Sequence, residues 1–169
     1  MVNCTLDRPM VPTDAFPLSR ALLQAILEDR TSDRLVCELV WHRLGYQPAG
    51  DALGAAGPTR WQAGPSTPPS WAERFPQAPE VIAERPASVA LTRSIAGAHK
   101  QLLKEQLGFA GYRICELYPR RTRRATAVNW LLAHQAERGM PLPETGPLPG
   151  LLAPPMDPRL GHPGDPPVG

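Results

Sequence analysis

The chain has 169 residues, a formal net charge of +2 and a hydrophobic fraction of 42%, which suits one domain of ordinary size with a packed core. Its 22 prolines and 14 glycines exclude a uniformly compact helical bundle. No apolar run approaches the roughly 18 residues that a membrane span requires, so no membrane span is expected.

Residues 1–17 are predicted to form a flexible N-terminus. This stretch lacks the apolar core of a signal peptide, and Asp7 and Asp14 argue against an acid-poor transit peptide. The three cysteines are far apart in the sequence and lack the spacing of a zinc site. We therefore expect a cytoplasmic protein without a metal site, in which Cys37 and Cys115 are buried thiols.

Two helices are predicted at the start of a single compact domain that spans residues 18–138. Leucines and isoleucines recur at helical spacing after Ser19, leucines and valines do so after Ser32, and each serine is a suitable N-cap. The first helix runs to about Asp29, and the second ends near Gly45, which readily adopts the left-handed conformation of a helix end. The short connection between them favours an antiparallel helical hairpin.

Residues 46–79 show no periodicity and are predicted to form a long loop or insertion. We expect Trp61 and Trp71 to anchor this loop to the core, since tryptophan buries a large apolar surface. A helical turn is predicted at residues 80–84, and it ends before Pro86.

Two strands are predicted in the second half of the domain. Residues 88–95 and 112–117 alternate apolar with polar side chains, a pattern typical of half-buried strands. A helix is predicted between them, over about residues 98–107, with Gly108 as its C-cap.

The last helix is predicted to follow Thr122 as N-cap and to end near Arg138. Within it, Asn129 is a poor helix former, so its amide is expected to bond the backbone of a neighbouring loop. Residues 139–169 contain ten prolines and six glycines and are predicted to be a disordered tail. The predicted fold class is α+β: a small, mostly helical domain in which a helical hairpin joins a strand–helix–strand–helix unit.

The sequence resembles a known family in three stretches: CELVWHRLGYQ (37–47), RPASVALTRSI (85–95) and KQLLKEQLGFAGYRICELYPRRTRRATAVNWLL (100–132). Over residues 18–135 the chain resembles an uncharacterised family of cyanobacteria and chloroplasts, domain of unknown function 1823. The last stretch is the most specific, because a GFAGY turn, an ELYPR element and the helix TRRATAVNWLL follow in order. The resemblance implies a cyanobacterial source and a cytoplasmic setting, and it implies no activity, cofactor or catalytic residue.

Positive charge is concentrated in one third of the chain. Residues 85–138 carry a net charge of +7, whereas residues 1–84 carry −3 and residues 139–169 carry −2. A helix N-terminus favours acidic residues because it carries a partial positive charge. The last predicted helix instead begins with four arginines around Thr122, which indicates a binding site: Arg120, Arg121, Arg123 and Arg124.

Forked guanidinium groups and the free N–H groups of a helix N-terminus together favour an anionic ligand. Basic residues of neighbouring segments are expected to extend the same surface: Arg93, Lys100, Lys104 and Arg113. The predicted function is a non-enzymatic binding or regulatory protein whose partner is an anionic macromolecule, either an acidic protein or a nucleic acid. The alternative is an ordinary solvated face in which Glu105 and Glu116 pair with some of the arginines.

Two further functions are kept as alternatives, an RNA- or DNA-binding accessory factor and a small enzyme with an unrecognised site. Tyr112 and Tyr118 are the only rings near the arginines in the sequence, fewer than a base-stacking platform uses. The sequence contains no G-x-S-x-G elbow, Walker loop, GxGxxG or HExxH motif. We therefore predict no catalytic residue, no cofactor and no metal.

Overall fold

The computed structural model describes residues 16–49 and 59–169. Most of the predicted flexible N-terminus and the centre of the predicted 46–79 insertion lie outside these ranges. The chain divides into two compact units. Among the described residues, unit 1 comprises 16–17, 41–49 and 59–78, and unit 2 comprises 18–40 and 79–169.

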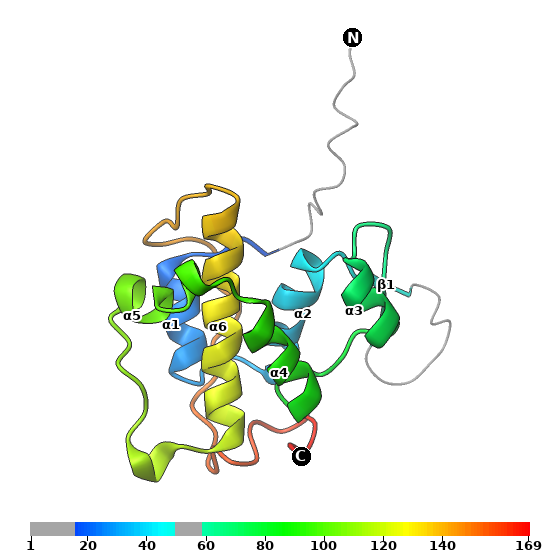
Figure 1. The fold of residues 1–169 in the computed structure, drawn as a ribbon. Helices are drawn as coiled ribbons and strands as arrows, with labels where there is room; N and C mark the ends of the chain where they lie inside the picture. The colour runs from blue at the N-terminus through cyan, green and yellow to red at the C-terminus, as the bar shows by residue number, and fades with distance from the viewer. Residues whose placement is uncertain (1–15, 50–58) are drawn as a thin grey trace. The chain divides into compact units, whose positions relative to one another are not determined.

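Within the described residues the fold is mostly helical, with six α-helices, short 3-10 helices and one two-stranded sheet (Figure 1). The prediction of a small, mostly helical α+β fold is confirmed. In chain order the elements are α1 (Arg20–Leu27), α2 (Asp33–Arg43), β1 (Gln47–Pro48), β2 (Trp61–Gln62), α3 (Pro69–Arg74), α4 (Arg85–Ser94), η2 (Gly97–His99), α5 (Leu102–Leu107), η3 (Ile114–Glu116) and α6 (Pro119–Glu137).

The first two helices begin at the residues that the sequence indicates; α1 ends at Leu27, slightly before the predicted Asp29, and α2 ends at Arg43, shortly before the predicted Gly45. The Ser19 hydroxyl accepts a hydrogen bond from the Leu22 amide at 3.1 Å, and the Ser32 hydroxyl accepts one from the Leu35 amide at 3.1 Å. Gly45 follows α2 with a φ of +87°. These positions are set by local hydrogen bonds and backbone sterics, which is why the sequence predicts them correctly.

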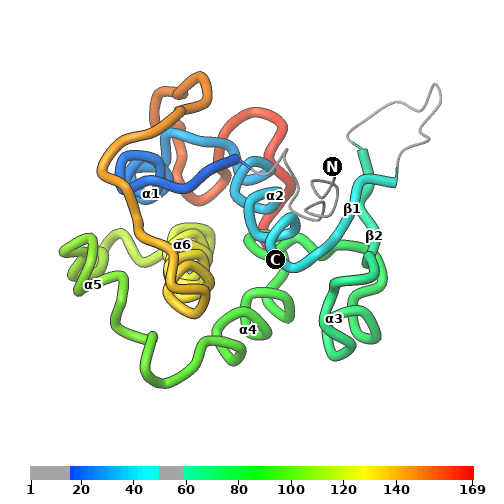
Figure 2. The backbone as a smooth tube through the Cα atoms, turned by 90° about the horizontal axis from the view of Figure 1, so that it is seen from above, coloured from blue at the N-terminus to red at the C-terminus, as the bar shows by residue number. Residues whose placement is uncertain are grey.

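Unit 2 is organised around α6. This helix packs against α1, α4 and α5, which surround it when the molecule is seen along the α6 axis (Figure 2). Its buried apolar face includes Val128, Leu131 and Leu132, and the buried residues of α1 include Leu22 and Ile26. Burying such side chains is the main favourable contribution to the fold of this unit.

Unit 1 contains the small sheet. Strands β1 and β2 are antiparallel, with Gln47 opposite Gln62 and Pro48 opposite Trp61. Trp61 and Trp71 are 5% and 7% exposed, so both rings are buried as predicted. The described part of residues 46–79 therefore contains a sheet and a helix, in addition to the loop that its composition suggests.

The two strands predicted in the second half of the domain are not formed. Residues 88–94 lie in α4, and the buried residues Ser88 and Leu91 of this helix, with Ile95 at its C-cap, recur at a spacing of three to four residues. A short alternating pattern fits this helical face as well as a strand, and packing on α6 decides between them. Residues 112–117 contain only the 3-10 helix η3, and Cys115 is exposed, so its predicted burial is wrong.

The ends of the last two helices differ in part from the prediction. Helix α5 begins at Leu102, after the 3-10 helix η2, and ends at Leu107, with the predicted C-cap Gly108 at a φ of +66°. Helix α6 begins at Pro119, three residues before the predicted N-cap Thr122. Proline suits this first position because a helix leaves the N–H of that residue unpaired.

Residues 139–169, for which the composition predicts disorder, follow a defined course along unit 2. Backbone hydrogen bonds join Arg20 to Pro143 at 2.8 Å, Leu152 to Arg30 at 2.9 Å and Gly169 to Ala83 at 2.8 Å. The composition does not reveal this course, because the hydrogen bonds form with distant residues of the domain and leave no periodic pattern in the tail itself. Proline also lowers the entropy lost on ordering, because its φ is fixed. We refer to residues 139–169 below as the C-terminal segment.

Candidate functional site

The first turns of α6 carry the four arginines of the predicted binding site. The structure places three of them inside unit 2: Arg120 is 0% exposed, Arg124 is 1% exposed and Arg123 is 9% exposed. A buried guanidinium needs hydrogen-bond acceptors and a compensating negative charge.

Arg120 is surrounded by three carboxylates. Its guanidinium donates to both oxygens of Asp29 at 2.7 and 2.9 Å, to Asp33 at 3.0 Å and to Asp165 at 3.1 Å. Burial lowers the pKa of Arg120, but the hydrogen bonds and charges of Asp29 and Asp33 outweigh it and leave the pKa above its usual value. The Arg120 guanidinium therefore remains charged at the centre of an internal ion-pair network.

Arg124 and Arg123 also bond acceptors within the unit. Arg124 donates to Asp33 at 2.6 Å, to the Thr31 hydroxyl at 2.8 Å and to the Ile26 carbonyl at 3.0 Å. Burial lowers the pKa of Arg123, and the positive charge of Arg85 nearby lowers it further. The Arg123 guanidinium donates to three carbonyl oxygens, at 2.9–3.1 Å: those of Ile82, Ala83 and Gly169.

These contacts change the interpretation of the arginine cluster. Arg120, Arg123 and Arg124 do not form the predicted outward surface, because their guanidinium groups join α6 to residues 26–33, to residues 82–83 and to the C-terminal segment. The Thr122 hydroxyl donates to the Pro119 carbonyl at 3.1 Å, within the first turn of α6.

The remaining predicted residues lie nearer the surface. The Arg121 guanidinium lies 5.4 Å from the centre of the Tyr112 ring, and its Nη1 is 3.7 Å from a carboxylate oxygen of Glu116. The predicted pairing of Glu116 with an arginine is thus formed at the longer end of ion-pair distance. Arg93 and Arg113 are exposed, the first on α4 and the second before η3.

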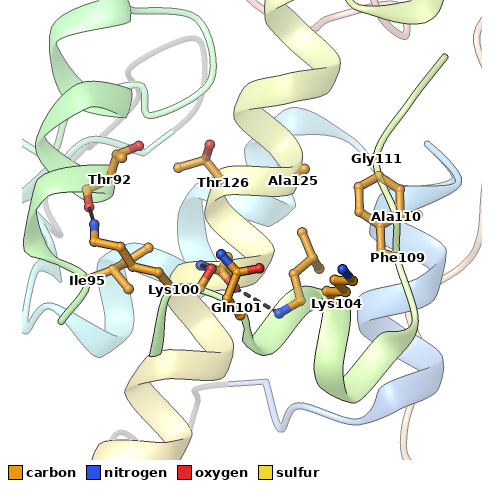
Figure 3. A pocket seen from close by; sticks show the side chains of 12 residues that line it. Thr92, Ile95, Lys100, Gln101, Lys104, Phe109, Ala110, Gly111, Ala125 and Thr126 are labelled. Atoms are coloured by element: carbon orange, nitrogen blue, oxygen red, sulfur yellow. Dashed lines mark hydrogen bonds between the residues drawn. The ribbon is translucent and has the colours of Figure 1, made fainter. Parts of the chain in front are cut away.

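A groove next to α6 collects the other two predicted residues, Lys100 and Lys104. It is a cavity of about 540 Å³ that is open to solvent and lies between α4, α5 and α6 (Figure 3). Its lining residues are Thr92, Ile95, Lys100, Gln101, Leu103, Lys104, Phe109, Ala110, Gly111, Ala125, Thr126 and Asn129. Lys100 and Lys104 are the only lysines in the 169 residues, and both are exposed.

Asn129 lines this groove and positions the helix that carries Lys104. Its side-chain oxygen accepts a hydrogen bond from the Leu103 amide at 2.9 Å, and its side-chain nitrogen donates to the Lys100 carbonyl at 3.4 Å. The predicted bond between the Asn129 amide and a neighbouring backbone is therefore confirmed. The Lys100 amine donates to the Thr92 carbonyl at 3.4 Å, a long hydrogen bond that a ligand can replace.

The groove combines amines with uncharged polar groups and apolar surface. None of the described residues that line it is acidic, and Ile95, Leu103 and Phe109 supply apolar contacts. Such a lining can hold a carboxylate or phosphate on the amines while an adjoining apolar group contacts the walls. Sequence reasoning did not identify the groove itself; the restriction of lysine to positions 100 and 104 was the signal that could have indicated it.

No metal centre is evident in the parts of the chain that the structure describes. Residues 16–49 and 59–169 contain no group of three or more His, Cys, Asp or Glu side chains arranged to hold a metal ion. Within the same ranges, no helix is both long enough and apolar enough to cross a membrane.

Comparisons with known proteins place residues 17–136 in a described family. These residues match a family model described as "Domain of unknown function (DUF1823)". A protein whose structure was solved by solution NMR is 47% identical, with a TM-score of 0.59; the match covers 73% of this chain and 98% of that one. No curated protein matches the chain.

Proposed function

The chain belongs to the DUF1823 family, and we propose that it is a non-enzymatic binding protein that holds an acidic segment of a partner protein in the groove of Lys100 and Lys104. The observation that carries this proposal is the position of the two lysines, since the only lysines of the chain line one groove. Two amines without a lining carboxylate attract an anion from solution.

The groove favours an acidic peptide over a nucleic acid. Its apolar residues Ile95, Leu103 and Phe109 can contact the apolar side chains of a peptide, which a sugar–phosphate backbone lacks. Phe109 is the only aromatic side chain among the described lining residues, whereas single-stranded nucleic acids are bound on several rings. RNA or DNA binding therefore remains the second candidate function.

Arg93, Arg113 and Arg121 extend the positive charge beyond the groove in this proposal. Arg93 follows the lining residue Thr92 on α4, and Arg121 lies one turn before the lining residue Ala125 on α6. Arg93 and Arg113 are exposed, and the side chain of Arg121 is 19% exposed. Charges outside a binding groove speed the approach of an acidic partner more than they tighten the complex.

A cytoplasmic setting is part of the same proposal. Cys37 and Cys115 are free thiols, and Cys115 is exposed. Thiols in this state suit a reducing compartment, where disulfides rarely persist.

The test uses the lysines as reporters. Dimethylation with ¹³C-labelled methyl groups retains their charge and adds one NMR signal for each of the two lysines and one for the α-amino group. A short peptide of leucine and glutamate is titrated into the full-length protein, and a single-stranded RNA oligonucleotide is titrated in parallel. We expect the peptide to shift both lysine signals.

Charge reversal of the two lysines shows whether the groove itself binds the peptide. The double variant Lys100→Glu/Lys104→Glu is expected to bind the peptide at least about tenfold more weakly, because each lysine contact becomes a repulsion. Arg138→Glu is the matched control, since Arg138 is exposed but does not line the groove, and its affinity should stay within about twofold of wild type. Lysine signals that move with RNA alone would favour the second candidate function, and signals that move with neither probe would overturn both.

A further inference from the structure

We propose that the arginines of α6 form a second binding site, specific for an acidic turn, and that the C-terminal segment occupies it as an exchangeable ligand. The partner that fits this site is a protein segment that presents one aspartate in a glycine-containing turn. This inference concerns Arg120 and Arg123 and does not depend on the lysine groove.

Asp165 of the C-terminal segment is held as a bound ligand would be. One of its carboxylate oxygens accepts from the Asp33 amide at 3.0 Å, and the other accepts from the Arg120 guanidinium at 3.1 Å. The Asp33 amide is the first of α2, where a helix has an unpaired N–H and a partial positive charge. Asp165 is 2% exposed at its side chain, so groups of the protein, and not water, compensate its charge.

The turn that presents Asp165 fits closely against Arg120. Gly161 has a φ of +90°. A Cβ atom at this position would lie 2.6 Å from Nε of Arg120 and 2.6 Å from Oδ2 of Asp165, the oxygen that accepts from Arg120. The His162 amide donates to that same oxygen at 2.8 Å, which fixes the carboxylate within the turn. Only glycine permits this approach of backbone to guanidinium.

The site offers an anion several donors once the C-terminal segment leaves. Arg120 and Arg124 pair with Asp29 and Asp33, so these buried charges balance without the segment. Departure of the segment removes the acceptors of three donors: the Asp33 amide and one N–H of Arg120 lose Asp165, and one N–H of Arg123 loses the Gly169 carbonyl. Because a buried donor without an acceptor is costly, the vacated site favours another acidic group in place of Asp165.

The C-terminal segment is suited to exchange because polar contacts, more than apolar burial, hold it. Large apolar side chains of the segment point to solvent, and Leu160 and Met156 are 69% and 102% exposed. The family match also ends at residue 136, so the segment lies outside the domain that defines the family. A segment attached through few apolar contacts opens more easily than the core on which it lies.

The experiment supplies the segment as a separate peptide. An opened chain is made by combining Gly161→Ala, which blocks the close approach, with Asp165→Asn, which removes the charge. The Asp33 amide reports occupancy because it donates to Asp165, and its hydrogen exchange is followed by NMR in the full-length protein. Gly150→Ala is the matched control, because a Cβ there would meet no atom within 4 Å.

We expect the Asp33 amide to exchange faster in the opened chain than in the wild type or in Gly150→Ala. A peptide of residues 157–169 should restore its protection and bind the opened chain at least about tenfold more tightly than the wild type, whose own segment competes. The same peptide with asparagine in place of Asp165 should fail to bind.

Three results would overturn the proposal. The first is an opened chain that stays folded and does not bind the peptide, and the second is equal binding of the aspartate and asparagine peptides. The third is an opened chain that loses its cooperative unfolding transition, because the segment would then be a permanent part of the fold and not an exchangeable ligand.

Discussion

The Arg120 guanidinium donates two hydrogen bonds, at 2.7 and 2.9 Å, to the carboxylate of Asp29, which lies 91 residues earlier in the chain. The two side chains are 0% and 2% exposed, so the pair is removed from water. A two-point contact between guanidinium and carboxylate fixes distance and orientation together. This pair therefore joins the start of α6 to the end of α1 and sets the position of the helix on which unit 2 is built.

Replacing Arg120 by glutamine should destabilise the protein strongly. The change leaves Asp29 and Asp33 with one buried arginine fewer, and breaking a buried ion pair from one side costs about 3–5 kcal/mol. The free energy of unfolding from urea denaturation measures the loss. Arg121→Gln is the control, because Arg121 makes a long ion pair with Glu116 and a contact with the Tyr112 ring, and its loss should cost less than about 1 kcal/mol. Equal losses for the two variants would contradict a special role for Arg120.

Tyr46 should make the stability of the protein sensitive to alkaline pH. Burial raises the pKa of Tyr46 to about 12, and its hydroxyl donates to the Phe75 carbonyl at 2.7 Å. The pKa of Tyr46 is thus higher in the folded state than the roughly 10 of a tyrosine in the unfolded chain. The protonated hydroxyl therefore contributes to the stability of the folded state in full below pH ~10, and this contribution is lost as the pH rises through about 12.

The variant Tyr46→Phe isolates this effect. At pH 7 it should be less stable by about 1 kcal/mol, since the Phe75 carbonyl loses its donor. The variant lacks the loss of stability linked to Tyr46 at alkaline pH, whereas the loss linked to Tyr112, whose pKa is also raised by burial, is common to both proteins. The difference in unfolding free energy should therefore shrink above pH ~10. A constant difference from pH 7 to pH 11 would contradict the prediction.

Replacing Asn129 by alanine should loosen α5. The Leu103 amide loses its acceptor, at a cost of about 1–2 kcal/mol, and should exchange its hydrogen faster with solvent. Asn129→Asp keeps an oxygen acceptor for Leu103 and is expected to retain most of the protection. Amide exchange measured by NMR distinguishes the variants, and unchanged exchange at Leu103 in the alanine variant would refute the role of Asn129.

Gly45 and Gly108 should respond differently to alanine. Both have positive φ, of +87° and +66°, so each substitution costs about 1–2 kcal/mol of backbone strain. At Gly45 the new Cβ would also lie 2.6 Å from the Ser66 hydroxyl and 2.8 Å from the Thr67 nitrogen, whereas at Gly108 it meets open space. Thermal unfolding should show the larger loss for Gly45→Ala, and the reverse order would be inconsistent with these contacts.

The predictions that succeed rest on short-range interactions. Ser19 and Ser32 bond amides three residues away, and Gly45 and Gly108 need only their own backbone to end a helix. The failed strand at residues 88–95 has the opposite cause. Its short apolar pattern fits two conformations, and only the packing of Leu91 and Ile95 in unit 2 selects the helix.

The candidate site shows the same division. The sequence identifies Lys100 and Lys104 as basic residues near one another in the chain, but the groove exists because α4, α5 and α6 meet. The arginines of α6 are the sharper case. No acidic residue lies beside them in the sequence, so the sequence suggests an exposed anion-binding site. The carboxylates that pair with Arg120 instead belong to Asp29, Asp33 and Asp165, which folding brings from elsewhere in the chain.

The sequence by itself determined the mostly helical character of this protein, the caps of its first helices, its family and the concentration of positive charge in residues 85–138. Only the tertiary structure decided which of those charges face solvent and that the proline-rich C-terminal segment is bound to the domain. The physical reason is the range of the interactions involved. Helix caps act over a few residues of one segment, whereas a buried guanidinium is stabilised by carboxylates that folding brings from distant parts of the chain.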